Sequence, residues 1–481
     1  MIKPSFTFRT AAGLLTALSM CSAQQPAPSG YRGMVRLNRA PVSNELLRIK
    51  LPRPVERKLS NGAKLLILET HRLPTVTFSI ETPLASLRDP DGLPGLAQAT
   101  ASLMMLGTTS RTAKQISDDL GEIGASVGVQ AGQGNGTVSV SSLTENFPAA
   151  LAIATDIVLH PSFPADEFEK WKTRTRSQLE QQKTNPGFLL NTEAMNLLYP
   201  DDARHARLTL ASLNRMTREN LIEEYKKYVV PSGEWAGIAG DVTPQQAIAW
   251  LDKAFGEWKG GPVAEVSLPI APPIAEKKVY LIARPGSVQT NLAITNRAID
   301  RTNPDYIACM VMNQVLGSGP AARLFRIIRE EKGYTYGVSS EFSATRFMQH
   351  FDSSMAVRTE VTEPALADLL KEMKEIRDVP VPKEELDAAK RTMVGRLALS
   401  LENPAGVLNQ WLTQREYNLP EDYWDQYPEK VMAVTAEDVQ RVAKKYVPYE
   451  NVQIIAVGDV AKIKDLLGKF GPVVEISPDS N

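Results

Sequence analysis

The alternation of apolar and polar residues predicts the same order of elements twice along the chain. An alternating stretch that predicts strand structure (residues 64–80 and 278–295) leads each time into an apolar stretch that predicts a helix (residues 95–105 and 306–316). More strands, and then long charged amphipathic helices, follow in each half. The pattern therefore predicts an α+β fold made of two similar sheet-plus-helix domains.

An internal repeat supports this division. Residues 216–242 align without gaps on residues 434–460, at an offset of 218, and nine of the 27 positions are identical. The same offset relates residues 164–168 to residues 382–386. A single offset shared by separate segments indicates that one domain design was duplicated.

Turn and cap residues set the expected boundaries. Thr217 and Thr435, each followed two positions later by an acidic residue, predict helix N-caps. A stretch rich in Pro and Gly between the halves predicts a linker. The expected organisation is a signal peptide (1–23), an N-terminal extension (24–50), a first domain (51–258), a linker (259–274) and a second domain (275–481).

The beginning of the chain predicts export. A short apolar run, residues 11–20, follows two basic residues and ends near a small-residue cleavage site after Ala23. The run is too short to span a bilayer. We therefore expect a secreted or periplasmic protein without a membrane span. Two alternatives stay open: a lipid anchor on Cys21, and an organellar transit peptide, because no acidic residue precedes Glu45.

Composition narrows the classes of function. The 54 Lys and Arg residues balance 55 Asp and Glu residues, and no cluster of Arg and aromatic residues is present, so we expect no nucleic-acid binding. After cleavage only Cys309 remains, within an apolar run. It is expected to be a buried core thiol, and the mature chain cannot form an internal disulfide.

Residues 95–108 (GLAQATASLMMLGT) resemble the G-L-A-H-F-L-E-H-M-L-F-K-G-T segment of the insulinase or pitrilysin-like metallopeptidases. In that family an inverted H-x-x-E-H motif binds zinc. Here the two histidine positions hold Gln98 and Ser102, and the glutamate position holds Ala101. The resemblance extends over residues 55–474 and implies the family's fold, with the two domains forming half of a clamshell.

The resemblance also implies a third zinc ligand, a glutamate roughly 75 residues after the second histidine. Counting forward reaches Gln178, which is a poor ligand, and Glu180 lies two residues away on another helix face. With Ala101 in place of the general base, no side chain could activate a zinc-bound water. We therefore expect no catalytic residue and no metal site in this chain.

Other chemistries are also weakly supported. The histidines His71, His160, His205 and His350 include no i, i+4 pair, so surface or capping roles are expected. Ser126 lies in a G-x-S-x-G pattern, but it follows a predicted helix and enters a predicted strand, the reverse of the order that a nucleophile elbow requires.

The second half retains a more specific pattern. Residues 316–338 resemble the family's G-x-G-x-x-S-R-L-F and R-E-x-x-G-L-x-Y segments, in which an Arg and a Tyr seven residues later reach toward the zinc site. The matching residues are Arg329 and Tyr336. A guanidinium and a phenol can hold a peptide carbonyl and stabilise an oxyanion. The alternative is a solvated helix end and a half-buried strand tyrosine, but the flanking motif favours substrate binding.

These observations predict a non-catalytic, substrate-binding subunit of a two-chain zinc peptidase. A partner with an intact H-x-x-E-H motif would supply the zinc, this chain would supply Arg329 and Tyr336, and the substrate would be a peptide. Two alternatives remain. One is a binding or assembly protein of the same family without proteolytic function, and the other is an active peptidase with a rebuilt site.

Overall fold

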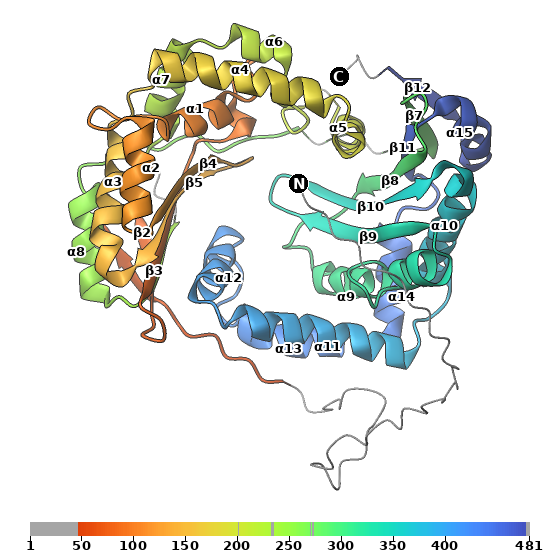
Figure 1. Cartoon of the computed structure of the whole chain (residues 1–481). Coiled ribbons are helices and arrows are strands. Elements are labelled where there is room, and N and C mark those ends of the chain that lie inside the picture. The colour runs from red at the N-terminus through yellow and green to blue at the C-terminus, as the bar shows by residue number, and fades with distance from the viewer. Residues whose placement is uncertain (1–46, 201, 232–234, 270, 272–273, 478–481) are drawn as a thin grey trace, which may run out of the picture. The chain divides into compact units, whose positions relative to one another are not determined.

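The computed structural model describes residues 47–477 except residues 201, 232–234, 270 and 272–273. Two six-stranded sheets with their helices make up this part of the chain, which confirms the predicted α+β class and the two sheet-plus-helix domains (Figure 1). The predicted signal peptide, Cys21 and most of the predicted extension lie outside the described residues, as do three positions of the predicted linker.

The two sheets repeat one strand order. The first sheet runs β1 (Val55–Lys58), β2 (Lys64–Glu69), β6 (Trp235–Gly240), β3 (Thr75–Thr82), β5 (Gly136–Leu143) and β4 (Ser126–Ala131). The second runs β12 (Val473–Ile476), β7 (Lys278–Ala283), β11 (Gln453–Gly458), β8 (Gln289–Arg297), β10 (Gln349–Arg358) and β9 (Thr335–Ala344). Five strands correspond in order, and the sheets differ at one edge, where β1 is antiparallel to β2 but β12 is parallel to β7.

Helices follow the strands in each half. In the first half they are α1 (Leu96–Met104), α2 (Ala113–Glu122), α3 (Phe147–Leu159), α4 (Ala165–Gln182), α5 (Pro186–Leu198), α6 (Leu210–Arg215), α7 (Arg218–Tyr228) and α8 (Pro244–Phe255). In the second half they are α9 (Tyr306–Leu316), α10 (Thr362–Asp378), α11 (Lys383–Ser400), α12 (Pro404–Glu416), α13 (Tyr423–Ala433), α14 (Ala436–Tyr446) and α15 (Val460–Leu467).

Each predicted alternating stretch is two strands rather than one, so this part of the prediction was wrong. Residues 64–80 divide into β2 and β3, with Pro74 just before β3, and β6 lies between the two strands in the sheet. Residues 278–295 divide into β7 and β8 at a turn in which Gly286 has φ 75°. Proline and a left-handed glycine interrupt strand pairing locally, although the apolar alternation continues across them.

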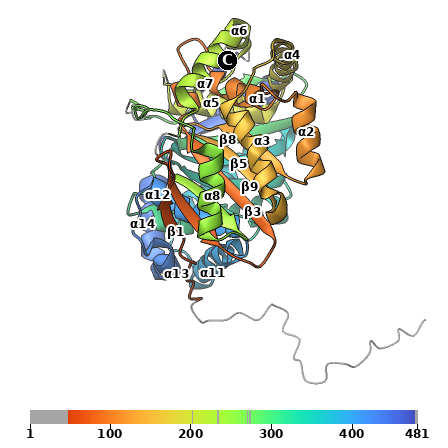
Figure 2. The same cartoon turned by 90° about the vertical axis from the view of Figure 1, so that its left-hand side faces the viewer.

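The first sheet is covered on both faces near β2, which explains why four consecutive residues of that strand are buried. Leu65 and Ile67 belong to the core beneath α3 and α8, which Figure 2 shows in front of the sheet. Leu66 and Leu68 face the opposite way and join the core that contains α12 of the second half. Successive side chains of a strand point to opposite faces, so both sets are shielded from water.

The two halves exchange helices. Helix α5 of the first half packs on β8 and β11 of the second sheet, while α12 of the second half packs on β6 and β2 of the first. The helices begin at Pro186 and Pro404, which the repeat offset relates (186 + 218 = 404). A Cβ atom on Gly237 of β6 would lie 2.8 Å from a methyl carbon of Leu408, so glycine permits this close contact.

The predicted helix N-caps are confirmed. Thr217 forms a capping box with Asn220, and Thr435 forms one with Asp438. In each box the threonine side chain accepts a hydrogen bond from the main chain three residues later, and that residue's side chain accepts one from the threonine N–H. These caps begin α7 and α14, the two helices of the longer repeat.

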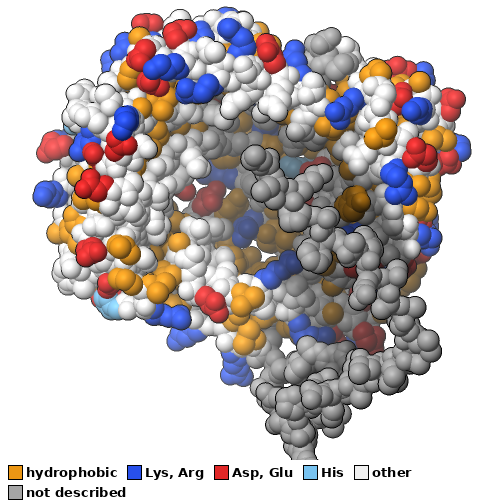
Figure 3. All heavy atoms as spheres, in the orientation of Figure 1, with side chains coloured by type: hydrophobic (Ala, Val, Ile, Leu, Met, Phe, Trp, Pro, Cys, Tyr) orange, Lys and Arg blue, Asp and Glu red, His pale blue; other side chains and the backbone are white. Residues whose placement is uncertain are grey.

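Lys and Arg side chains are interspersed with Asp and Glu side chains over the face seen in Figure 3. This mixture matches the balanced composition. Within the described ranges, no helix is long and apolar enough to cross a membrane.

Candidate substrate-binding site

Hydrogen bonds and close packing fix the start of α1. The carboxylate of Asp89 accepts hydrogen bonds from the main-chain N–H groups of Gly95 (2.6 Å) and Ala97 (2.8 Å). Gly95 has φ 89°, and a Cβ atom there would lie 2.6 Å from Cβ of Leu208. Only glycine fits both the backbone conformation and this contact. Burial raises the pKa of Asp89 to about 6, although its hydrogen bonds to the main chain oppose the shift.

The end of the motif is also fixed by packing. A Cβ atom on Gly107 would lie 2.8 Å from Cγ of Pro164. The hydroxyl of Thr108 donates to the carboxylate of Asp156 at 2.7 Å, and Arg111 pairs with the same carboxylate at 2.7 Å. The glycines and threonine that carry the resemblance therefore have structural roles that need no metal.

The positions that would bind zinc carry no ligand. Gln98 is exposed on α1, and Ser102 lies one turn later, where its hydroxyl donates to the main-chain carbonyl of Gln98 at 2.8 Å. Ala101 is buried, with 2% of its surface exposed. The i, i+4 geometry of the two ligand positions is preserved, but the side chains are an amide and a hydroxyl bonded to its own helix.

The third ligand position does not supply a substitute. Gln178 and Glu180 are both exposed on α4. Across the residues that the structure describes, no three His, Cys, Asp or Glu side chains are grouped so that they could hold a metal ion. Ser126 opens β4 after α2, the helix-to-strand order that the sequence predicts. Cys309 is buried, and burial raises the pKa of its thiol to about 12.

The structure brings Arg329 and Tyr336 together at the end of a π-helix, η3 (Phe325–Glu331). Nε of Arg329 donates to the main-chain carbonyl of Tyr336 at 3.1 Å, and the guanidinium stacks on the ring of Phe325 at 4.5 Å. Gly333, with φ 64°, turns the chain from η3 into β9. The side chain of Arg329 is 41% exposed and Tyr336 is 94% exposed. The contact joins side chain to backbone, so both the phenol and part of the guanidinium face solvent.

Two contacts fix this segment to the rest of the domain. Arg323 is buried and makes a bidentate ion pair with Glu385 of α11, at 2.8 and 2.7 Å. Asn313 of α9 and Ser340 of β9 exchange hydrogen bonds of 3.0 and 2.6 Å. These contacts anchor the segment that carries the exposed pair to α9 and α11.

A cavity of about 480 Å³ lies beside the pair. Phe325 and Gly337 line one side of it, and Leu190 of α5 lines another. Strands β9 and β10 contribute further wall residues of mixed size: Val338, Ser339, Ser354, Met355 and Ala356. Strand β9 ends the strand order of its sheet, so one of its sides is not paired with another described strand.

The sequence did not identify Phe325 or Glu385 as part of the site. Phe325 lies four residues before Arg329, a spacing that places two side chains on one helical face and could have indicated the stacking. Glu385 lies 62 residues from Arg323, and no local pattern relates them.

The comparisons with known proteins agree with this fold. Residues 65–208 match the profile of the insulinase family (peptidase family M16), and residues 215–393 match a profile described as the peptidase M16 inactive domain. A protein of Rickettsia bellii described as an uncharacterized zinc protease is 22% identical over 400 residues, covering 81% of this chain and 93% of that protein. A protein of Helicobacter pylori described as a non-peptidase homolog, YmxG, is 22% identical over 385 residues, covering 79% of this chain and 88% of that protein.

A solved structure described as a peptidase M16 inactive domain from Pseudomonas fluorescens superimposes with a TM-score of 0.77 at 27% identity, covering 84% of this chain and 98% of that chain. A protease structure from Helicobacter pylori gives a TM-score of 0.76 at 15% identity, covering 85% of this chain and 100% of that chain. At this identity the similarity shows the fold alone. The chain belongs to the insulinase family, as its motif residues predict, and the described residues lack that family's zinc motif.

Proposed function

We propose that this chain is the non-catalytic, substrate-binding subunit of a two-chain zinc peptidase. One observation carries the proposal. The chain keeps Arg329 and Tyr336 at an exposed sheet edge, while the zinc-ligand positions hold Gln98, Ser102 and Gln178. A partner with an intact H-x-x-E-H motif would bind the zinc and supply the general base.

The chemistry of the pair supports this role. The Nη groups of Arg329 are not used by the bond from Nε, and Nη1 lies 3.7 Å from the carboxylate of Glu330, beyond hydrogen-bond distance. The guanidinium can therefore donate to a peptide carbonyl, and the exposed phenol of Tyr336 can donate to an oxyanion. Both groups act from this chain on a bond that the partner's zinc-bound water attacks.

The substrate would be an extended peptide. Strand β9 lies at the edge of its sheet, where main-chain groups that are not already bonded can pair with an added strand. The carbonyl of Tyr336 already accepts from Arg329. The N–H of Ser340 donates to Gly317 and its carbonyl accepts from Asn313, so an added strand would pair at other positions of β9. The neighbouring cavity, with Gly337 and small side chains on its wall, leaves room for side chains of that peptide. We expect the chain to bind its substrate outside the cytoplasm, with export directed by residues 1–23.

A second candidate is a binding or assembly protein of the same family without proteolytic function. The observation that favours it is that Arg329 is already bonded to the main chain of Tyr336 and stacked on Phe325, contacts that could serve structure alone. The relative described as a non-peptidase homolog is compatible with either candidate.

The test combines this chain with an insulinase-like protein that carries an intact H-x-x-E-H motif, chosen from the same organism. Hydrolysis of quenched fluorescent peptides is measured for each chain alone and for the mixture. We expect activity only in the mixture, reduced about 10²-fold to 10³-fold by Arg329→Ala or Tyr336→Phe, because each substitution removes one donor to developing charge.

Arg326→Ala is the matched control. Arg326 lies on the same π-helix but pairs with Glu331 at 2.5 Å, so its loss should leave the rate unchanged. Complex formation and thermal unfolding are measured for each variant. Full activity in both the Arg329 and Tyr336 variants would reject the proposal and favour the binding or assembly protein.

A further inference from the structure

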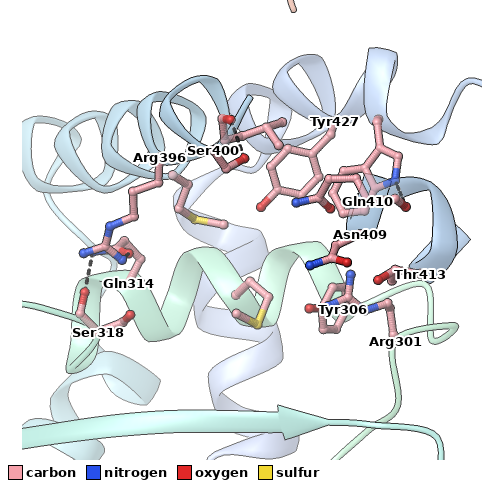
Figure 4. A pocket seen from close by; sticks show the side chains of 14 residues that line it. Arg301, Tyr306, Gln314, Ser318, Arg396, Ser400, Asn409, Gln410, Thr413 and Tyr427 are labelled. Carbon is pink, nitrogen blue, oxygen red and sulfur yellow. Dashed lines mark hydrogen bonds between the residues drawn. The ribbon is translucent and has the colours of Figure 1, made fainter. Parts of the chain in front are cut away.

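A second cavity, of about 430 Å³, lies in the helical layer of the second half (Figure 4). Residues from α9, α11, α12 and α13 line it. Its volume falls within the range typical of ligand sites. It shares no lining residue with the cavity beside Arg329 and Tyr336.

The charged side chains that line this cavity are all cationic. Arg301 and Arg396 contribute to the wall, and no Asp or Glu does. Arg396 donates from Nη1 to the side-chain oxygen of Gln314 at 3.1 Å. The guanidinium of Arg301 lies 5.2 Å from the ring centre of Tyr306 and 5.6 Å from that of Tyr417. Within the described part of the chain neither arginine has a carboxylate partner, so both charges remain available to an anion.

The two cationic groups stand at opposite ends of the cavity. Figure 4 shows Arg396 with Gln314 at one end and Arg301 with Tyr306 at the other. Tyr306 and Gln314 are eight residues apart on one face of α9, which places them about 12 Å apart along the helix axis at ~1.5 Å per residue. Met310 lies midway between them on the same face, so the centre of the wall is apolar.

Neutral donors complete the end near Arg301. Asn409 and Thr413 of α12 and Tyr427 of α13 line the cavity there. Burial raises the pKa of Tyr427, so its phenol stays protonated and can donate a hydrogen bond. An anionic group at this end would therefore meet a guanidinium and several neutral donors without a competing carboxylate.

From this arrangement we infer that the cavity binds a short acidic peptide in extended form, with one carboxylate held by Arg396 and another by Arg301. An extended chain advances about 3.3–3.6 Å per residue, so acidic side chains three positions apart span roughly the required distance. Apolar residues between them would contact Met310 and Leu397. The inference deepens the proposed function, and rests on it, in taking a peptide as the ligand.

The test is direct binding to the isolated chain, which requires no partner. Isothermal titration calorimetry is run with acetyl-Glu-Leu-Leu-Glu-amide and with its Gln-Leu-Leu-Gln and Lys-Leu-Leu-Lys counterparts. We expect saturable binding of the acidic peptide only. Arg301→Gln and Arg396→Gln should each weaken it by about tenfold, the typical effect of losing one charge-assisted hydrogen bond.

Arg391→Gln is the matched control, because Arg391 lies on α11 with the same charge but does not line the cavity. The Arg391→Gln variant should bind the acidic peptide with the same affinity as the parent chain, and all variants should have the same thermal unfolding midpoint. Equal binding of the acidic and neutral peptides, or unchanged binding in the Arg301→Gln, Arg396→Gln double variant, would overturn the inference.

The two proposals fail separately. Arg329→Ala should leave this binding intact, because Arg329 lies outside the cavity. If the acidic peptide binds but mixing with the partner gives no hydrolysis, the proposed function is wrong and the acidic-peptide site stands. If hydrolysis depends on Arg329 while the peptide does not bind, the acidic-peptide site is wrong.

Discussion

Arg329 uses a single hydrogen bond, from Nε to the carbonyl oxygen of Tyr336 at 3.1 Å, to fix the exit of a π-helix against the first residues of an edge strand. The same guanidinium lies over the ring of Phe325. A π-helix frequently marks a functional site, and here its hydrogen bond from Lys332 N–H to the carbonyl of Ile327 (3.0 Å) shifts the last turn that carries Arg329. One side chain therefore both organises the local backbone and presents its Nη groups to solvent, with Nη1 lying 3.7 Å from the carboxylate of Glu330.

Because these two tasks need a planar group with several donors, lysine should not replace Arg329. A lysine ammonium can offer charge, but it cannot stack on Phe325, bond the Tyr336 carbonyl and hold a substrate carbonyl together. We expect Arg329→Lys to lower hydrolysis by the assembled complex nearly as much as Arg329→Ala does. A lysine variant that retains the parent rate would mean that positive charge alone is sufficient.

The parent chain should retain no stoichiometric zinc after dialysis, because Gln98, Ser102 and Gln178 are poor ligands. Close packing at Gly95 and Gly107 fixes the backbone around α1. We therefore expect these positions to bind zinc when they carry metal-binding side chains. The triple variant Gln98→His, Ser102→His, Gln178→Glu should take up zinc, measured by metal analysis.

The variant with the two histidines alone is the control for that experiment and should retain less zinc than the triple variant. Neither should hydrolyse peptides, since Ala101 supplies no base. Stoichiometric zinc in the parent chain, lost on Ser102→Ala, would contradict the loss of this site.

Gly95 should be intolerant of a side chain. Its φ of 89° and the 2.6 Å approach of Leu208 both penalise a Cβ atom, so we expect Gly95→Ala to lower the free energy of unfolding by about 2 kcal/mol or more. Gly121 lies within α2 with no heavy atom near its Cβ position. Gly121→Ala should therefore be neutral or raise stability by up to about 1 kcal/mol. Equal thermal unfolding of the two variants would show that the N-terminus of α1 can rearrange.

Much of the fold could be predicted because its signals are local. Helix α9 has the bounds that the apolar run predicts, and the caps at Thr217 and Thr435 were identified from adjacent residues. The exchange of α5 and α12 between the halves could not be predicted. It depends on which sheet face is left uncovered, and hydrophobic periodicity shows that a face is buried without showing what covers it.

The candidate sites show the same difference between local and long-range features. Arg329 and Tyr336 are seven residues apart and carry a recognisable motif, so sequence located them, while their roles stay a prediction. The cavity that contains Arg301 and Arg396 joins positions 95 residues apart (396 − 301), on different elements. Neither arginine lies in a motif, and only the packing of the helices shows that no carboxylate faces them.

The carboxyl group of Glu224 should make the chain less stable as the pH rises. Glu224 lies on α7, packed against α1, and its Oε1 is buried without a hydrogen-bond partner among the described residues. Its pKa is raised to about 7, chiefly by burial and also by the charge of Asp89, while Lys227 opposes the shift. Its pKa in the unfolded chain is about 4.3. Between about pH 4.3 and 7 the folded state thus binds more protons, and the free energy of unfolding falls as pH rises.

Glu224→Gln removes this titration while keeping the shape of the side chain. We expect the variant to be more stable than the parent at pH 8, by an amount on the order of 2–3 kcal/mol, and to show a smaller decline from pH 5 to pH 8. Glu223→Gln, at an exposed neighbouring position, should follow the parent at every pH. Urea unfolding at several pH values measures the difference. A parent chain whose stability rises over this interval, with no change in Glu224→Gln, would show that Glu224 stays ionised in the folded state.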